Sequence, residues 1–118
     1  MNSENEFKSR FTFDERYNQT SNIRLKYPKR IPVFVSRSCY NNCPKIDRNK
    51  FLVPNDLTIG QFMFVIRKRM KLSSEKSIYL FVNNKIPPTS SLISNVYELN
   101  KNSDGFLYIT YSAESTFG

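Results

Sequence analysis

The sequence predicts a single α+β domain in which a four-stranded mixed sheet packs against helices. Three observations favour this class. The chain has 118 residues, which is the length of one domain. Four short runs rich in β-branched and aromatic residues have strand length, at 30–37, 50–53, 77–82 and 106–111. One longer stretch, 58–70, repeats its apolar residues at helical spacing and ends in cations.

The N-terminal region, 1–28, is expected to contain one well-patterned helix. Residues 1–12 are polar with scattered aromatics and no clear period, so we expect a mobile arm or a poorly fixed first helix there. From Phe13 onward, acidic residues come first and basic residues last, which matches the charge preference of a helix dipole. Pro28 then ends this helix.

The first strand is predicted at 30–37, RIPVFVSR, where Val33 and Val35 alternate with Phe34. Pro32 interrupts this run and has no backbone N–H to donate. Part of the strand should therefore lie at a sheet edge or at a bulge.

The stretch 50–70 combines a short strand with an amphipathic helix. The strand, KFLV at 50–53, is stopped by Pro54. Thr58 can then cap a helix, with Gln61 three residues later as its capping-box partner. The apolar face of this helix is predicted to consist of Ile59, Phe62, Met63, Ile66 and Met70.

Two strands and a short helix are predicted after position 76. The run 77–82, SIYLFV, is almost continuously apolar, so a central strand buried on both faces is expected. Ser90 or Ser91 can cap the short helix. The run 106–111, FLYITY, alternates and forms the last strand. The predicted apolar face of the short helix is Leu92, Ile93, Val96, Tyr97 and Leu99.

The order helix, strand, strand, helix, strand, helix, strand favours a β-grasp, ubiquitin-like roll. Parallel neighbours in a sheet need a crossover, and the helix at 58–70 can supply one. A ferredoxin-like RNA-binding sheet is the competing topology. It requires a helix directly after its first strand, whereas here two strands precede the first long helix of the sheet.

The composition excludes several classes of protein. No apolar run approaches the roughly 18 residues of a membrane helix, and the polar N-terminus has no signal-peptide core, so an intracellular protein is expected. Two cysteines and no histidine exclude a Cys/His zinc site and a Cys–His nucleophile pair. We therefore expect no metal, no cofactor and no enzyme activity. Cys39 and Cys43 are expected to be free thiols.

The net charge of +8 is unevenly distributed. Residues 1–71 carry 15 Lys and Arg against six Asp and Glu, whereas residues 72–118 carry three against four. A basic half suggests either an acidic partner or a solvated surface, and charge alone leaves both open. Nucleic acid is not expected, because the aromatic strand 106–111 lies in the weakly acidic half, away from the positive charge.

Five stretches resemble one known family in order and spacing. They are KYPKRIPV (26–33), KFLVPNDLTIGQF (50–62), IRKRM (66–70), LFVNNKIPPTS (80–90) and GFLYITYS (105–112). The sequence from about Phe13 to Gly118 is similar to the autophagy-related ubiquitin-like modifiers, the autophagy-related protein eight family that includes GABARAP. The resemblance implies a β-grasp core with two N-terminal helices. It divides the chain into an N-terminal arm and helical region (1–28), a ubiquitin-like domain (29–112) and a flexible C-terminal conjugation tail (113–118).

The resemblance also implies a modification at Gly118. Members of this family are joined through a C-terminal glycine to phosphatidylethanolamine on autophagosomal membranes. Expected partners are the activating and conjugating enzymes and a cysteine protease for processing or delipidation. The expected location is the cytoplasm, and the autophagosome membrane when lipidated. Relatives usually carry residues after this glycine, so this sequence is expected to be either a ready-to-use product or a trimmed, mature form.

The second implied site is a groove along 50–53 that binds short peptides with aromatic-x-x-aliphatic motifs, carried by cargo receptors and autophagy proteins. An exposed strand edge can bind an extended peptide in this way. The first pocket corresponds to Ile23, Pro32, Lys50, Leu52 and Phe106. The second corresponds to Phe51, Val53, Pro54, Leu57, Phe62 and Val65. Acidic residues flanking the motif would be attracted by Arg30, Arg48 and Arg69. The alternative is a ubiquitin-like adaptor that binds peptides without being conjugated.

The basic cluster at the end of the predicted helix has three interpretations that the sequence leaves open. It is a solvated helix end, a contact for the conjugation enzymes, or a contact for anionic lipid headgroups. Its members are Arg67, Lys68, Arg69 and Lys71.

Overall fold

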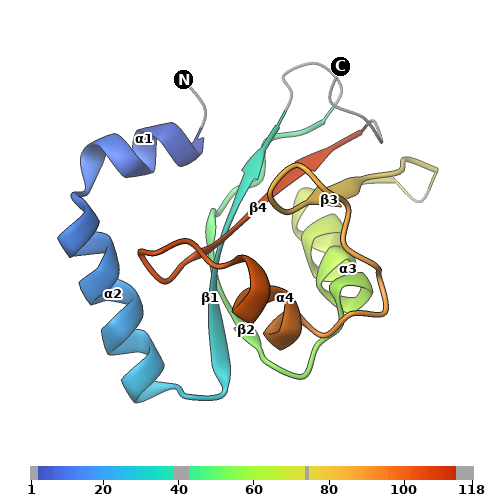
Figure 1. Cartoon of the computed structure of the whole chain (residues 1–118). Coiled ribbons are helices and arrows are strands. Elements are labelled where there is room, and N and C mark those ends of the chain that lie inside the picture. Colours follow the sequence, from blue (N-terminus) through green and yellow to red (C-terminus); the bar gives the residue numbers. More distant parts are fainter. Residues whose placement is uncertain (1–2, 39–42, 74, 114–118) are drawn as a thin grey trace.

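The computed structural model describes residues 3–38, 43–73 and 75–113, which form four helices and one four-stranded sheet (Figure 1). The helices are α1 (Ser3–Arg10), α2 (Phe13–Lys26), α3 (Ile59–Met70) and α4 (Ile93–Asn100). The strands are β1 (Arg30–Arg37), β2 (Lys50–Pro54), β3 (Tyr79–Phe81) and β4 (Leu107–Ser112). The predicted α+β class with two N-terminal helices is confirmed.

The strands lie in the order β2-β1-β4-β3, so β2 and β3 form the two edges of the sheet. β1 is antiparallel to β2 and parallel to β4, and β3 is antiparallel to β4. Helix α3 connects the two edge strands, which leaves the parallel pair at the centre, as in a β-grasp sheet. β1 pairs with β4 only from Val33 onward, so Pro32 has a neighbouring strand, β2, on one side only. This agrees with the predicted edge character of Pro32.

The prediction of a central strand at 77–82 is wrong. The strand there spans Tyr79–Phe81 and lies at an edge of the sheet. The run is apolar because it covers the core: Ile78, Leu80 and Val82 all belong to the main hydrophobic cluster. The apolar run correctly indicated that these side chains are buried. It did not indicate a central position, because an edge strand is also buried where it covers the core.

Helix α3 begins and packs as predicted. Thr58 Oγ1 accepts a hydrogen bond from the N–H of Gln61 at 3.1 Å, and Gln61 Oε1 accepts one from the N–H of Thr58 at 2.8 Å. The predicted apolar face is buried except for Met63, which is half-buried at its margin. The helix ends at Lys71, where a left-handed φ of 54° turns the chain. α3 thereby covers one face of the sheet with apolar side chains.

Helix α4 begins differently from the prediction, because its N-cap is Leu92 and no side chain caps it. The N–H of Ile93 instead donates to the carbonyl of Leu57 at 2.8 Å. In return, the N–H of Ile59 donates to the carbonyl of Ser91 at 2.8 Å. The beginnings of α3 and α4 therefore satisfy each other's backbone groups, so neither Ser90 nor Ser91 is needed as a cap.

The predicted apolar face of α4 is only partly right. Ile93, Val96 and Tyr97 are buried at the spacing of one helix face. Leu92 and Leu99 are 39% and 84% exposed. Leu92 precedes the first turn and Leu99 lies on the far side of this eight-residue helix, so neither reaches the core.

The opposite face of the sheet carries α1 and α2. Phe7 of α1 is 6% exposed and stacks on Phe34 of β1, with ring centroids 4.6 Å apart. It also meets Phe106 edge-on at 5.3 Å. The expectation of a mobile arm or poorly fixed helix is therefore wrong for Ser3–Arg10, because one aromatic side chain anchors α1 to the sheet.

Candidate functional site

β2 is the edge strand at which most of the predicted site residues gather. It pairs with β1 on one side, with Leu52 opposite Pro32. Its side chains alternate between the two faces of the sheet. Phe51 and Val53 enter the main core on the α3 side. Lys50 and Leu52 consequently face α1 and α2, so the two predicted pockets lie on opposite faces of one strand.

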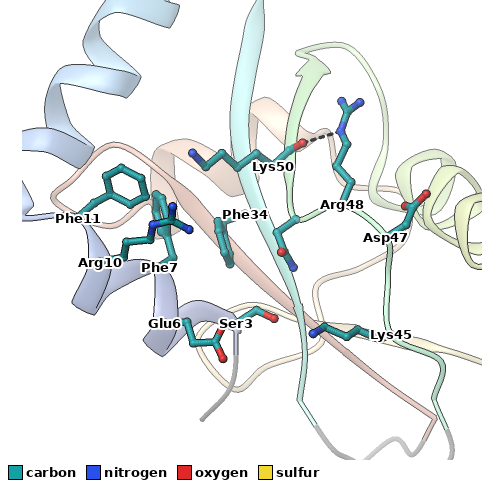
Figure 2. A pocket seen from close by; sticks show the side chains of 11 residues that line it. Ser3, Glu6, Phe7, Arg10, Phe11, Phe34, Lys45, Asp47, Arg48 and Lys50 are labelled. Carbon is teal, nitrogen blue, oxygen red and sulfur yellow. Dashed lines mark hydrogen bonds between the residues drawn. The ribbon is translucent and has the colours of Figure 1, made fainter.

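Lys50 reaches from β2 toward the N-terminal helices (Figure 2). Its Nζ donates a hydrogen bond to Gln19 Oε1 at 3.2 Å. The same atom lies 4.8 Å from the ring centre of Phe7 and 5.3 Å from that of Phe11. Burial, and then the nearby guanidinium of Arg10, lower the pKa of Lys50. This side chain therefore joins the edge strand to both N-terminal helices.

A hollow of about 570 Å³ lies beside Lys50 (Figure 2). It is bounded by α1, by Phe34 of β1 and by the segment 45–50. The excess of positive charge around it favours an acidic ligand. The charged side chains lining it are Arg10, Lys45, Arg48 and Lys50, against Glu6 and Asp47.

The five residues predicted for the first pocket are partly brought together. Three adjoin across the β1–β2 ladder, namely Pro32, Lys50 and Leu52. Phe106 is 2% exposed and is covered from the α1 side by Phe7. Ile23 is half-buried on α2. Of these five residues, Lys50, Leu52 and Ile23 are accessible, whereas Pro32 and Phe106 are buried.

The six residues predicted for the second pocket lie around the junction of β2 and α3. Three are core residues with exposures of 6% or less, namely Phe51, Val53 and Phe62. The rings of Phe51 and Phe62 meet edge-on at 5.6 Å. The accessible part consists of the half-buried Pro54 and Leu57, and of Val65, which is 37% exposed.

Two of the three predicted flanking arginines bond to the backbone of β2. Arg30 Nη1 donates to the carbonyl of Leu52 at 3.3 Å. Arg48 Nε donates to the carbonyl of Lys50 at 2.9 Å (Figure 2). Its guanidinium also lies 5.1 Å from the ring centre of Phe51. Both guanidinium groups therefore lie along the strand edge that a peptide would approach.

The basic cluster at the end of α3 contains two kinds of side chain. Arg67 donates to backbone carbonyls of the loop that follows the helix. Arg69, the third predicted flanking arginine, forms an ion pair with Asp47 at 3.2 Å. Within the part of the chain that the structure describes, Lys68 and Lys71 have no acidic partner. The two arginines thus stabilise local structure, and the two lysines remain available for the partner or lipid contacts left open by the sequence.

Helix α1 is a part of this site that was not predicted from the sequence. Phe7 and Phe11 are four residues apart, and that spacing would have indicated one face of a helix.

The predicted conjugation residue, Gly118, lies outside the described residues, the last of which is Ala113.

Comparison with known proteins identifies the family of this chain and agrees with its fold. A family model described as autophagy protein Atg8, ubiquitin like, matches residues 15–118. The chain belongs to the Atg8 family. It is 55% identical to autophagy-related protein 8e of Arabidopsis thaliana over 118 residues, covering all of this chain and 97% of the relative. It is 52% identical to autophagy-related protein 8 of Schizosaccharomyces pombe over 113 residues, covering 96% of this chain and 93% of the relative.

Two solved structures of Atg8 proteins have the same fold as this Atg8-family chain. Trypanosoma brucei ATG8 superposes with a TM-score of 0.87 at 38% identity, covering 95% of this chain and 97% of that one. Plasmodium falciparum Atg8, solved in complex with a Plasmodium falciparum Atg3 peptide, superposes with a TM-score of 0.86 at 40% identity. It covers 94% of this chain and 98% of that one. This chain is therefore an autophagy-related ubiquitin-like protein.

Among the helices of the described residues, none combines the length and apolar character that spanning a bilayer requires. The same residues contain no group of three or more His, Cys, Asp or Glu side chains arranged to hold a metal ion.

Proposed function

We propose that this chain is a non-enzymatic ubiquitin-like modifier of autophagy. It is conjugated through Gly118 to phosphatidylethanolamine on autophagosomal membranes, and it recruits partners through a peptide groove along β2. The observation that carries this proposal is the unpaired edge of β2, whose successive side chains face two different pockets in an Atg8-family fold. ATP for conjugation is used by the activating enzyme, since the chain itself has no phosphate-binding loop.

The geometry of β2 accounts for an aromatic-x-x-aliphatic motif. A peptide added to this edge would be a strand, in which side chains alternate between faces. Residues three apart point to opposite faces, so one can enter the pocket at Lys50 and Leu52 while the other enters the pocket at Leu57 and Val65. The strand therefore selects spacing, and the pockets select the aromatic and aliphatic side chains.

Peptide binding by a relative supports the groove. Plasmodium falciparum Atg8 has been solved in complex with an Atg3 peptide. For this chain we propose the same kind of ligand, namely short segments of the activating and conjugating enzymes, of the processing protease and of cargo receptors. The segment 113–118 serves as the conjugation tail, and the domain is cytoplasmic until that tail is lipidated.

A double substitution tests the groove. Lys50→Ala with Leu52→Ala is expected to weaken an aromatic-x-x-aliphatic peptide by about 2 kcal/mol, or roughly 30-fold in Kd, as truncation of central binding residues does. Isothermal titration calorimetry measures this. The matched control is Leu99→Ala with Lys101→Ala, which removes the same residue types from the exposed side of α4 and its C-cap. Equal affinity of the groove variant and the control would overturn the groove assignment.

Reconstituted conjugation tests the modification. The 118-residue chain is mixed with activating and conjugating enzymes, ATP and phosphatidylethanolamine vesicles, and intact mass is measured for wild type and for a Gly118 deletion. A lipid adduct on wild type alone is the expected result. No adduct on wild type, with a competent control protein in the same mixture, would favour the unconjugated peptide-binding adaptor instead.

A further inference from the structure

The free edge of β2 offers few backbone groups. The N–H of Val35 donates to the carbonyl of Asn49 at 2.8 Å, and the N–H of Asn55 donates to the carbonyl of Lys29 at 2.9 Å. Antiparallel ladders alternate, so every second residue of this strand bonds to β1, and the residues between them direct their backbone groups outward. Because Asn49 and Asn55 bond toward β1, Phe51 and Val53 between them do so as well. The outward-facing residues of β2 are therefore Lys50, Leu52 and Pro54.

Pro54 contributes nothing to this free edge. It has no N–H, and its carbonyl accepts from the N–H of Leu57 at 3.2 Å. A peptide can therefore form backbone hydrogen bonds with two residues of the strand, Lys50 and Leu52. Each offers one donor and one acceptor.

Both of these acceptors already have a donor. Arg48 Nε bonds to the carbonyl of Lys50 at 2.9 Å (Figure 2), and Arg30 Nη1 bonds to that of Leu52 at 3.3 Å. The two arginines come from different elements, one from the segment before β2 and one from β1. Each guanidinium therefore competes with an N–H of an added strand for the same carbonyl oxygen.

We propose that Arg30 and Arg48 are exchangeable caps of the β2 edge, which makes peptide binding depend on acidic flanks. The incoming peptide replaces each guanidinium with its own N–H, and the released guanidinium bonds to a carboxylate beside the motif. This mechanism rests on the proposed peptide-binding function of β2. It adds a second role for the acidic flank. Besides attracting the peptide from a distance, the flank compensates for the hydrogen bonds that are lost when the caps are displaced.

The energetic order of the bonds favours this exchange. A guanidinium bonds more strongly to a carboxylate than to a neutral carbonyl, because both partners are then charged. Among the described residues, neither Arg30 nor Arg48 has an acidic partner, since the nearby Asp47 is paired with Arg69 at 3.2 Å. A peptide with acidic flanks therefore gains two stronger bonds for the two that it displaces. A neutral peptide displaces the same two bonds without that gain.

The caps also have a role in the unbound protein. An edge strand with unsatisfied donors and acceptors can pair with a second copy of the chain, and charged side chains over the edge oppose this. Arg48 is kept in place by the ring of Phe51, 5.1 Å from its guanidinium. The same two side chains that select acidic peptides therefore cover the edge when no peptide is bound.

The test uses two peptides and one double variant. The peptides share an aromatic-x-x-aliphatic motif and differ only in their flanks, which contain Asp and Glu in one and Asn and Gln in the other. The variant is Arg30→Met with Arg48→Met, which keeps long side chains but removes all donors. Binding of the full 118-residue chain is measured by calorimetry at one fixed ionic strength. The matched control is Lys85→Met with Lys101→Met. It removes one charge next to β3, at the sheet edge opposite β2, and one at the C-cap of α4.

The two peptides are expected to respond in opposite directions. The acidic peptide should lose about tenfold or more in affinity for the variant, because two charge-assisted bonds are lost. The neutral peptide should gain about two- to fivefold, because it no longer displaces a hydrogen bond. The control should change both affinities equally and by less than about twofold, as remote charges do at moderate salt.

Two results would overturn parts of this picture, and they are distinguishable. If the neutral peptide binds the variant as wild type or more weakly, the arginines are rim charges and the exchange mechanism is wrong, while the groove stands. If neither peptide binds wild type, the proposed groove itself fails, and the mechanism with it.

Discussion

The two faces of the sheet are held by different kinds of interaction. On the α3 side, a large apolar cluster joins all four strands to α3 and α4, with Ile66, Ile93 and Leu107 all fully buried. On the α1 and α2 side, the cluster of buried apolar residues contains three aromatics, Phe7, Phe34 and Phe106. The first face is stabilised by area removed from water, whereas the second depends on a few directional contacts. The proposed groove along β2 lies at the border between them.

The directional contacts converge on Asp104, which is fully buried. Its Oδ2 accepts from Arg16 Nε at 2.8 Å and from the hydroxyl of Tyr108 at 2.6 Å, and its Oδ1 accepts from the N–H of Phe106 at 2.9 Å. The hydroxyl of Thr20 donates to its carbonyl at 2.7 Å. Arg16 and Thr20 belong to α2, so one buried carboxylate fastens that helix to the turn before β4.

The largest effect is expected from Asp104→Ala. It leaves Arg16, whose side chain is 11% exposed, without its carboxylate, and breaking one partner of a buried ion pair costs about 3–5 kcal/mol. Urea unfolding followed by circular dichroism measures the loss. The double variant Arg16→Met with Asp104→Leu should recover part of it, because no unpaired charge remains, although the N–H of Phe106 and the hydroxyl of Tyr108 still lose their acceptor. A double variant as unstable as Asp104→Ala would show that the ion pair is not what fastens α2.

The apolar face gives the next largest effect. Ile66→Ala removes a fully buried side chain of α3 and is expected to cost about 2–5 kcal/mol of unfolding free energy. Met63→Ala is the matched comparison on the same helix, and it should cost about 1 kcal/mol because Met63 is only half-buried. Thermal and urea unfolding of both variants measure the difference. Equal losses of unfolding free energy would mean that the buried face of α3 is assigned to the wrong residues.

The α3 face was predictable from the sequence because its signals are local. Thr58 and Gln61 are three residues apart, and the apolar positions of α3 follow one helical period. The failures have non-local causes. Arg16 and Asp104 are 88 residues apart, and no period or propensity links them. The edge position of β3 likewise depends on strand order, which an apolar run does not encode.

The candidate site divides in the same way. The predicted pocket residues came from the family resemblance, and all of them except Ile23 and Val65 lie in the matching stretches. The roles of Arg30 and Arg48 as donors to β2 could not, because they depend on which carbonyls the register of the ladder turns outward. The contact of Lys50 with Phe7 and Phe11 was also missed, because it requires α1 to be docked.

The ionisation of Tyr108 offers a test, by pH, of the contacts around Asp104 on the α1 and α2 side of the sheet. Burial, and then its hydrogen bond to Asp104, raise the pKa of Tyr108 in the folded state. A raised folded pKa means that the stabilisation is present below the unfolded tyrosine pKa of about 10 and is lost as pH rises above it. Tyr108→Phe should cost about 1–2 kcal/mol at neutral pH, as loss of a hydrogen bond to a charged group does.

The variant should also lose less stability than wild type between about pH 9 and pH 11, the range in which an unfolded tyrosine ionises. Urea midpoints at several pH values measure this. Tyr97, whose pKa burial also raises, contributes the same sign in both proteins. The lowered pKa of Lys50 contributes the opposite sign in both, so the difference between the two proteins isolates Tyr108. Parallel curves would contradict the assigned role of its hydroxyl.

The smallest effect is expected from removing a helix cap on either face of the sheet. α2 and α3 both begin with a capping box, Thr12 with Glu15 and Thr58 with Gln61. Thr12→Ala and Thr58→Ala should each cost their helix about 1 kcal/mol. If the N-terminal helices can open separately from the rest, Thr12→Ala should speed amide exchange mainly in α2, while Thr58→Ala lowers global stability. Hydrogen exchange beside urea unfolding separates these outcomes. Equal losses of global unfolding free energy in the two variants would mean that α1 and α2 unfold together with the main core. The contacts at Asp104 and Phe7 would then be enough to join them into one cooperative unit.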